Sequence, residues 1–280
     1  MITRFAPSPT GPLHLGHAFS ALTGQARAQA AGGSFLLRIE DLDRARSRPE
    51  WEAQIFDDLH WLGCRWPTPV RRQSDHLADY EAALERLAAR GLLYPCSCTR
   101  GDIRAALSAP QEGVPVGPDG IVYPGTCRGR PMTSRRPGDA LRLDMARAAE
   151  LVARLAFTET GPGHAGRHEV RTAELVESAG DIVLGRRDTG SVAYHLAVVH
   201  DDALQGVSEV VRGADLFEAT PLQVLLQALL GLPTPTYHHH DLIRDAQGRR
   251  LAKRDDARAI ATYRAEGMSP AEVRRMFGFD

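Results

Sequence analysis

The sequence predicts an α/β fold in which a parallel sheet is interrupted by an inserted module and followed by a short helical extension. Residues 2–39 contain a strand, a loop, a helix and a second strand, an order that is typical of parallel sheets. The alternation breaks at about residue 92, where short apolar pieces, three cysteines and Gly- and Pro-rich stretches follow. It returns at Asp181. The break and the return together indicate an insert within one α/β domain.

The elements before the insert are placed by turn residues and apolar spacing. Residues 2–5 are predicted as a strand, and a helix from about residue 14 to residue 31 ends at two glycines. Residues 34–39 form the second strand. Two more helices are expected, one opened by Pro49 and one over residues 75–90.

The elements after the insert repeat the same alternation. Strand-like segments are expected at residues 181–184 and 193–199, and another strand near residues 209–211. Thr220 then acts as the N-cap of a strongly apolar helix. A capping box beginning at Ser269 predicts a short terminal helix.

Composition excludes several classes of protein. The chain has 280 residues, of which 43% are hydrophobic, enough for a buried core. Its net charge of −1 gives no overall attraction to nucleic acid, so a polyanion must be met by local patches. No apolar run approaches the roughly 20 residues that span a bilayer, and the first residues lack a signal-peptide core. Only four cysteines are present. We therefore expect a cytoplasmic protein with no membrane partner.

A motif of two histidines opens the first helix, at His14-Leu15-Gly16-His17. A helix N-terminus favours phosphate, and two imidazoles three residues apart can add donors to phosphate oxygens. Gly16 would let a flat base approach the backbone. An ordinary pair of surface histidines is the alternative.

Lys253 is the single lysine among 34 basic residues. A genomic bias toward arginine accounts for the other positions but not for this exception. A compact ammonium differs from a planar guanidinium and suits contacts with phosphate. The surrounding residues 244–254 are basic and have no apolar period, which predicts a cationic loop that could close on a triphosphate; a solvated surface is the alternative.

Three cysteines in the insert have the spacing of a metal site. Cys96, Cys98 and Cys127, with one phenolate or imidazole, could complete a tetrahedral zinc centre, and Tyr123 is the predicted fourth ligand. Three reduced structural thiols are the alternative. Cys64 stands apart and is expected in the core.

Six segments in this order resemble the catalytic half of the glutamyl-tRNA synthetases, a class I family. They are residues 4–11, 14–17 and 38–41, Tyr194 with Asp201 and Asp202, residues 211–215, and the loop around Lys253. Collinear motifs over nearly the whole chain are far more specific than any one of them. The resemblance implies a Rossmann-type fold split by an insertion, and ATP-dependent activation of glutamate.

The resemblance also implies roles for single residues. For L-glutamate it places Arg4 and Arg212 near the carboxylates, Glu40 at the α-ammonium, and Ser8 and Tyr194 as hydrogen-bonding groups. Bidentate guanidinium groups suit carboxylates, but the sequence leaves open which arginine faces which one. Surface salt bridges are the alternative for each charged residue.

For ATP, bound with Mg²⁺, the resemblance implies contacts from His14, Gly16, His17 and Lys253. The family's loop usually has the pattern Lys-x-Ser-Lys, whereas this chain has Arg250 and Ala252 at its first and third positions. The second lysine is retained as Lys253.

The resemblance divides the chain into three parts. Residues 1–91 and 181–240 form the Rossmann-type catalytic domain, residues 92–180 the inserted acceptor-binding and zinc module, and residues 241–280 the lysine loop with a short helical extension. The order Cys-x-Cys, Tyr-x₃-Cys resembles the structural Zn²⁺ module of the glutamyl-queuosine tRNA(Asp) synthetases, which are shortened relatives. Only 26 residues follow Arg254, too few for anticodon-binding domains.

The resemblance therefore implies that a monomer transfers glutamate to queuosine in the anticodon loop of tRNA(Asp). Basic residues at 65–72 and 128–136 are candidate tRNA contacts. Three alternatives remain open. One is a truncated synthetase that charges tRNA(Glu), one a non-catalytic glutamate-sensing or RNA-binding paralogue, and one an enzyme that glutamylates a non-RNA acceptor.

Overall fold

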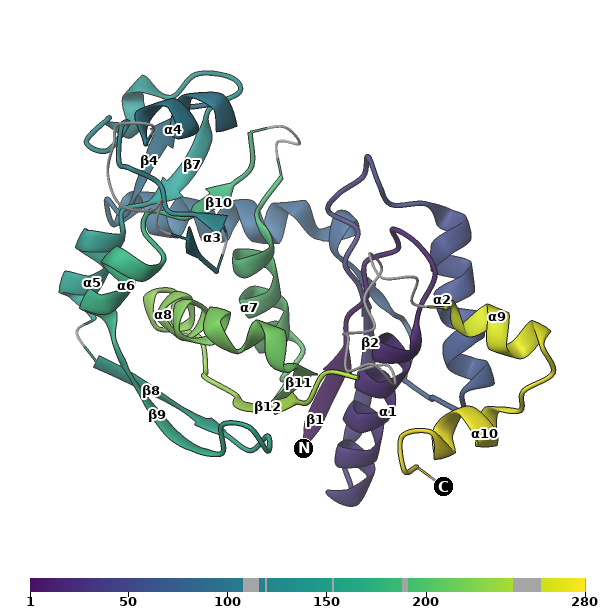
Figure 1. Ribbon diagram of the computed structural model, residues 1–280. Coiled ribbons are helices and arrows are strands. Elements are labelled where there is room, and N and C mark those ends of the chain that lie inside the picture. The colour runs from purple at the N-terminus through teal and green to yellow at the C-terminus, as the bar shows by residue number, and fades with distance from the viewer. Residues whose placement is uncertain (108–115, 119, 153, 188–190, 244–257, 280) are drawn as a thin grey trace.

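Two neighbouring sheets, one from the first part of the chain and one from its later part, form the centre of the computed structural model, and most of their strand pairs are parallel (Figure 1). The structure describes residues 1–107, 116–118, 120–152, 154–187, 191–243 and 258–279.

The first half of the sheet confirms the predicted strand, helix and strand unit. Strand β1 (Ile2–Phe5) pairs in parallel with β2 (Ser34–Ile39), and α1 (Leu15–Ala30) connects them. Strand β2 pairs in parallel with the short β3 (Arg71–Arg72). The buried residues of α1 lie on its apolar face, and Gly33 ends the connection where a side chain would collide with the carbonyl of Met1. The carboxyl ends of β1 and β2 therefore reach the same edge of the sheet.

The second half comes from the C-terminal part of the chain. Strand β11 (Glu209–Gly213) pairs in parallel with β12 (Thr236–His240), joined through the 3-10 helix η3 (Ala214–Ala219) and α8 (Thr220–Leu230). The backbone N–H of Ser208 donates to the carbonyl of Ile2 over 2.9 Å, and β11 lies beside β1. Thr220 and Pro221 open α8 as predicted, but Ala219 is its N-cap residue.

Three helices, α2, α3 and α7, lie beside the central sheets. Helix α2 spans Pro49–Trp61, and α3 spans Leu77–Ala89 after the 3-10 helix η1 (Gln73–His76). Helix α7 (Tyr194–Leu204) corrects the prediction of a strand-like segment at residues 193–199. Residues 195–199 of that run are all buried, and burial on all sides removes the periodic pattern that distinguishes a helix from a strand.

The inserted module has its own antiparallel sheet. Strand β7 (Ala140–Leu143) pairs with β4 (Leu93–Cys96) on one side and with β10 (Val183–Gly185) on the other. Helix α4 (Arg100–Ala106) begins at a capping box formed by Thr99 and Asp102. Figure 1 shows this module at one end of the molecule.

A second part of the insert reaches back to the central sheet. Helices α5 (Met145–Leu151) and α6 (Thr172–Ser178) flank the hairpin of β8 (Arg154–Glu159) and β9 (Gly166–Arg171). Strand β8 pairs in parallel with β12 at Glu159 and Tyr237. A two-residue hairpin, β5 (Val116–Gly117) with β6 (Gly120–Ile121), completes the described insert. The insert thereby places Glu159 next to a strand of the central sheet.

The C-terminal extension packs on the opposite end of the molecule. It contains α9 (Ile260–Ala265) and α10 (Pro270–Arg275), and Ser269 caps α10 as predicted. Ile260 and Val273 are fully buried in the core that also contains α1 and α2. Within the described ranges, the helices are all too short or too polar to cross a bilayer.

Candidate functional site

A cavity of about 260 Å³ lies where β1, β2 and β11 end and α1 begins. Seven of the predicted site residues line it: Arg4, His14, Gly16, His17, Glu40, Tyr194 and Arg212. Ser8 is exposed and does not line this cavity. Lys253, with Arg250 and Ala252, lies outside the described residues. The structure therefore brings together residues that are separated by about two hundred positions in the sequence.

A buried network of charges holds the floor of the cavity. Arg38 is fully buried and donates to Asp202 over 2.7 Å and to Glu40 over 3.0 Å. Arg4 donates from Nε to the same oxygen of Asp202 over 3.0 Å, and from Nη1 to the carbonyl of Val211. Burial raises the pKa of the Glu40 carboxyl, against the opposing effect of Arg38. Arg4 thus already has a protein carboxylate as its counter-ion.

Asp201 fixes the neighbouring elements in the same way. Its carboxylate accepts from Arg71 over 2.9 Å, from Gln73 over 2.9 Å and from Tyr80 over 2.8 Å. Burial opposes its ionisation, but contacts with His200, Arg38 and these donors outweigh burial and lower the pKa of Asp201 to about 2. The carboxylate therefore ties β3, η1 and α3 to α7.

Arg212 has a different environment from Arg4. It is 5% exposed, and among the described residues its guanidinium donates only to neutral acceptors: His239 Nε2, Gln223 Oε1, Thr220 Oγ1 and the carbonyl of Leu216. Within the described part of the chain it forms no ion pair. A buried guanidinium without a counter-ion is costly, so Arg212 is the group that would gain most from a bound carboxylate.

His14 and His17 form the predicted pair at the start of α1. Their ring centroids lie 3.7 Å apart and their planes differ by 23°. His14 Nδ1 accepts the backbone N–H of Gly16, and His17 Nδ1 accepts that of His14. Because each Nδ1 is an acceptor, the neutral rings carry their protons on Nε2.

The residues that flank the predicted cationic loop lie at the same cavity. Leu242 and Ile243, on its N-terminal side, line the cavity. On the C-terminal side Ala259 forms a β-bridge with His14, and the N–H of Ile260 donates to the carbonyl of Leu13 over 2.9 Å. Both sides of the segment are therefore anchored beside the histidine pair.

A second cavity, of about 920 Å³, adjoins the first at Tyr194, which lines both. Five arginines line the second cavity: Arg100, Arg104, Arg142, Arg186 and Arg187. Arg142 is 8% exposed and lies over the Tyr123 ring at 3.8 Å, and its buried Nε has no partner among the described residues. Such a lining suits a large anionic ligand.

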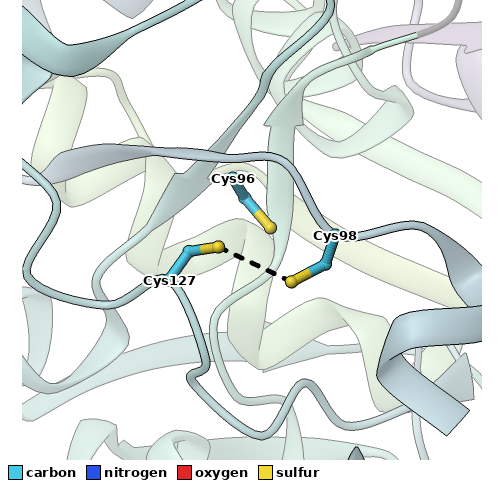
Figure 2. A group of neighbouring side chains, drawn as sticks. All are labelled: Cys96, Cys98 and Cys127. Atoms are coloured by element: carbon cyan, nitrogen blue, oxygen red, sulfur yellow. Dashed lines mark hydrogen bonds between the residues drawn. The ribbon is translucent and has the colours of Figure 1, made fainter. Parts of the chain in front are cut away.

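The four predicted metal ligands come together in the insert, and Figure 2 shows the three cysteines among them. The sulfur atoms of Cys96, Cys98 and Cys127 all lie within 4.8 Å of one another. The Tyr123 hydroxyl lies 3.4 Å from the sulfurs of Cys96 and Cys98, and it accepts the N–H of Cys127 over 2.8 Å. Three thiols and one phenol at these distances fit a tetrahedral zinc ion.

The cysteines differ in acidity. Burial opposes ionisation of Cys127, but hydrogen bonds with Tyr123, Ser97 and Cys98 outweigh burial and lower its pKa to about 6. Burial raises the pKa of Cys98 to about 11. One thiolate is therefore favoured at neutral pH, and a bound cation would be needed to hold three.

Most arginines of the two basic stretches make internal contacts. Arg71 pairs with Asp79 and Asp201, and Arg72 pairs with Glu52. In the second stretch Arg128 pairs with Asp181 and Arg130 with Asp139. Arg135 and Arg136 are exposed and form no ion pair within the described ranges. The prediction of tRNA contacts at these stretches stays a prediction.

Several residues at or beside the cavity were not predicted as site residues from the sequence. His240 lines it, as does Asp215, which belongs to the predicted segment 211–215 but was given no role. His239 contacts Arg212 directly, and Glu159 does so through His239. The run of three histidines at 238–240 was a visible signal for two of them. The sequence contains no such signal for Glu159, because Glu159 comes close to Arg212 only through the pairing of β8 with β12.

The fold and the site define a class I tRNA synthetase catalytic domain. The sequence matches the family described as tRNA synthetases class I (E and Q), catalytic domain, over residues 1–278, and the chain belongs to this family. It is 62% identical to a Glutamyl-Q tRNA(Asp) synthetase from Rhodobacter capsulatus over 281 residues, which is 99% of this chain and 100% of that protein.

Two further comparisons agree with this family. A Glutamyl-Q tRNA(Asp) synthetase from Symbiobacterium thermophilum is 44% identical over 96% of this chain and 83% of its own length. The crystal structure of a glutamate tRNA ligase from Elizabethkingia meningosepticum, in complex with its amino acid, has a TM-score of 0.77 and 28% identity. That alignment covers 99% of this chain, which spans 60% of the ligase chain.

Proposed function

We propose that this chain, as a monomer in the cytoplasm, activates L-glutamate with ATP and transfers it to queuosine in the anticodon loop of tRNA(Asp). Its relatives with this activity in their names match nearly the whole chain. The observation that carries the proposal is Tyr194, which lines both the small cavity and the arginine-lined cavity. One cavity would hold glutamate and ATP, and the other would receive a nucleotide of the acceptor RNA.

Glutamate recognition rests on charge complementarity in the small cavity. Arg212, which has no counter-ion among the described residues, takes a carboxylate of the substrate. Glu40 faces the α-ammonium, and this interaction favours its ionised form against burial. Tyr194 donates a hydrogen bond from its hydroxyl. Arg4 acts with Asp202 as a fixed pair that shapes the wall.

Activation forms a bond between the α-carboxylate oxygen of glutamate and the α-phosphorus of ATP, and breaks the bond to pyrophosphate. The Nε2–H groups of His14 and His17 and the ammonium of Lys253 stabilise the charge that develops on the departing pyrophosphate. Mg²⁺ bound with ATP supplies further neutralisation of the phosphates. No side chain needs to act as a covalent nucleophile, because positioning and electrostatics lower the barrier.

Transfer uses a hydroxyl of the cyclopentene ring of queuosine. Its oxygen bonds to the carbonyl carbon of the adenylate, the bond from that carbon to the phosphate oxygen breaks, and the hydroxyl proton leaves with AMP. The arginines of the large cavity would hold the phosphates on either side of that nucleotide. Arg100 and Arg104 lie on α4 and form no ion pair within the described part of the chain, so their charges are available to RNA.

A zinc ion would be held by Cys96, Cys98, Cys127 and Tyr123, and its role would be structural. These residues connect β4 to the segment that precedes β7, and α4 begins at Arg100, two residues after Cys98. The ion would thus fix the helix that carries Arg100 and Arg104 beside the acceptor cavity.

The decisive experiment combines two assays. Glutamate-dependent exchange between ATP and pyrophosphate, without tRNA, tests activation. Labelled glutamate supplied with tRNA(Asp), with and without queuosine, tests transfer. We expect exchange without RNA and labelling only of the queuosine-containing tRNA, including after periodate oxidation of the terminal ribose. Labelling of periodate-sensitive tRNA(Glu) would instead identify a synthetase for that tRNA, and absence of exchange would identify a non-catalytic paralogue.

Variants of the large cavity test its role in transfer. We expect Arg104→Ala to raise the KM for tRNA about tenfold while leaving exchange unchanged, because one phosphate contact is lost. Arg86→Ala, an exposed arginine of α3 that lines neither cavity, is the matched control. Equal effects of both variants, or loss of exchange with Arg104→Ala, would remove the acceptor role of this cavity.

A further inference from the structure

Arg212 is oriented by a chain of hydrogen bonds that begins in the inserted module. Its Nε donates to His239 Nε2 over 2.9 Å, and His239 Nδ1 contacts Glu159 Oε2 at 2.5 Å. The three side chains are at most 5% exposed. Arg212 lies on β11, His239 on β12 and Glu159 on β8, so three adjacent strands contribute one residue each.

The direction of each hydrogen bond follows from the donor groups. A guanidinium can only donate, so His239 Nε2 must carry a lone pair and its proton must be on Nδ1. That Nδ1–H then donates to Glu159 Oε2. The tautomer of His239 is thus fixed by its two neighbours rather than by solvent.

Glu159 is held as a carboxylate. Its Oε1 accepts the backbone N–H of His239 over 2.9 Å and that of Gly161 over 2.6 Å, in addition to the contact of Oε2. Burial opposes ionisation, but these donors outweigh it and keep the pKa of Glu159 below its usual value. Three hydrogen-bond donors fix the orientation of this carboxylate. Glu159 is therefore the fixed end of the hydrogen-bonded series that leads through His239 to Arg212.

We propose that His239 and Glu159 are positioning residues that hold the Arg212 guanidinium in the orientation that binds a carboxylate of glutamate. The inference deepens the proposed function and rests on glutamate occupying the small cavity. Four neutral acceptors surround Arg212 in the described part of the chain, and His239 is the one whose proton is held on the far ring nitrogen by a carboxylate. Through His239, Glu159 of the insert therefore influences the affinity of the small cavity for glutamate.

A merely structural role for His239 makes a different prediction. The ring packs with Phe217 at 5.3 Å between centroids and with Tyr237 at 6.0 Å, so its removal also disturbs aromatic packing. Two amide substitutions separate packing from hydrogen bonding. In His239→Gln the amide oxygen reaches the position of Nε2 and still accepts from Arg212. In His239→Asn the amide nitrogen replaces Nδ1 and still donates to Glu159, but Arg212 loses its acceptor.

Glutamate affinity, measured by calorimetry, and the KM values for glutamate and ATP in pyrophosphate exchange are the readouts. We expect His239→Asn to weaken glutamate binding about tenfold or more and to leave the KM for ATP unchanged. His239→Gln should stay within about threefold of wild type. His60→Asn, an exposed histidine of α2, is the control for the substitution itself.

Glu159→Gln tests the remote end of the chain. Its amide oxygen would accept the two backbone N–H groups, which turns the amide nitrogen toward His239 and forces Nδ1 to become the acceptor. The proton then moves to Nε2 and faces the Nε–H of Arg212. We expect the glutamate affinity of Glu159→Gln to fall as in His239→Asn. The double variant Glu159→Gln with His239→Gln should bind glutamate no more weakly than His239→Gln alone.

The outcomes are distinguishable. If wild type binds glutamate and both amide variants of His239 have equal affinities, or if Glu159→Gln leaves the affinity unchanged, the positioning role is refuted. If wild type neither binds glutamate nor catalyses exchange, the proposed function fails. Thermal unfolding of each variant shows that the chain is folded, since a change confined to glutamate affinity leaves the melting temperature within the range of the control.

Discussion

His14 and His17 stack with ring centroids 3.7 Å apart, and both rings use Nδ1 to accept a backbone N–H at the start of α1. One ring atom of each histidine therefore caps the helix, and the opposite atom carries the proton. The same side chains complete the fold locally and, in the proposed function, present donors to phosphate oxygens. The cap and the proposed donor use different atoms of these rings, so mutation can separate stability from catalysis.

His14→Asn is expected to keep the cap and remove the donor. Asparagine is among the best N-cap residues, because its amide oxygen lies where Nδ1 accepts the Gly16 N–H. We expect the melting temperature to change little and kcat for pyrophosphate exchange to fall about 100-fold, as for loss of one preorganised donor. His14→Ala should lower both. Unchanged kcat in His14→Asn, with the helix intact, would contradict a role in charge stabilisation.

The fold could be predicted where its signals were local. The strands at residues 2–5 and 34–39 and the helix that opens at Pro49 were placed correctly, because turn residues, glycines and Pro49 mark their ends. The run at residues 193–199 was predicted as strand-like but lies at the start of α7. The error arose because residues 195–199 are all buried and so show no exposed polar face. The element type there is decided by packing against other elements.

The site could be predicted where motifs carried it. The seven lining residues were found through collinear segments, and three cysteines with Tyr123 through their spacing. Glu159 and His239 could not be found in this way. Their contact depends on β8 of the insert pairing with β12 of the central sheet, a relationship between distant strands that no local pattern encodes.

Replacement of Asp201 should reduce stability in a pH-dependent manner. Its pKa is lowered to about 2 in the folded protein, against about 3.9 when unfolded. A lowered pKa means that the carboxylate stabilises the fold above about pH 4 and that this contribution is lost as pH falls toward 2. We expect Asp201→Asn to lower the free energy of unfolding by about 2 kcal/mol or more at pH 7.

Urea denaturation at pH 7 and pH 3 measures this difference. The gap between wild type and Asp201→Asn should narrow at the lower pH, because wild type then loses part of the same contribution. Asp57→Asn removes an exposed carboxylate that pairs with Arg264 and is expected to change stability by less than about 1 kcal/mol. A gap that is equal at both pH values would show that Asp201 acts through packing and not through charge.

Metal removal tests the cysteine cluster. We expect one zinc ion per chain by elemental analysis, and a chelator should lower the melting temperature because the ion links segments on either side of α4. Cys98→Ser should lose the ion, and Cys64→Ala should keep it, since Cys64 is buried in a different cluster. Tyr123→Phe should weaken zinc binding. Full zinc content in Tyr123→Phe would assign the fourth position to another ligand.

The affinity for glutamate should depend on pH through His239 only in acid. Burial is the main cause that lowers the pKa of His239, with Arg212 adding to it and Glu159 opposing it, to a value of about 4. The groups that face the ring are Glu159 from β8, Arg212 from β11, the Thr220 hydroxyl from α8 and His164. Imidazole therefore stays neutral, and keeps its acceptor for Arg212, down to about pH 5.

Calorimetric titration of glutamate from pH 8 to pH 4.5 should show a constant ratio of affinities between wild type and His239→Gln down to about pH 5. Below that, wild type should lose affinity relative to the variant, because a protonated ring offers Arg212 no acceptor and adds a like charge beside it. The variant corrects for protonation of glutamate itself. A wild-type loss centred near pH 6.5 would mean that the ring titrates as an ordinary solvent-exposed histidine, which is incompatible with a fixed Nδ1–H tautomer between Glu159 and Arg212.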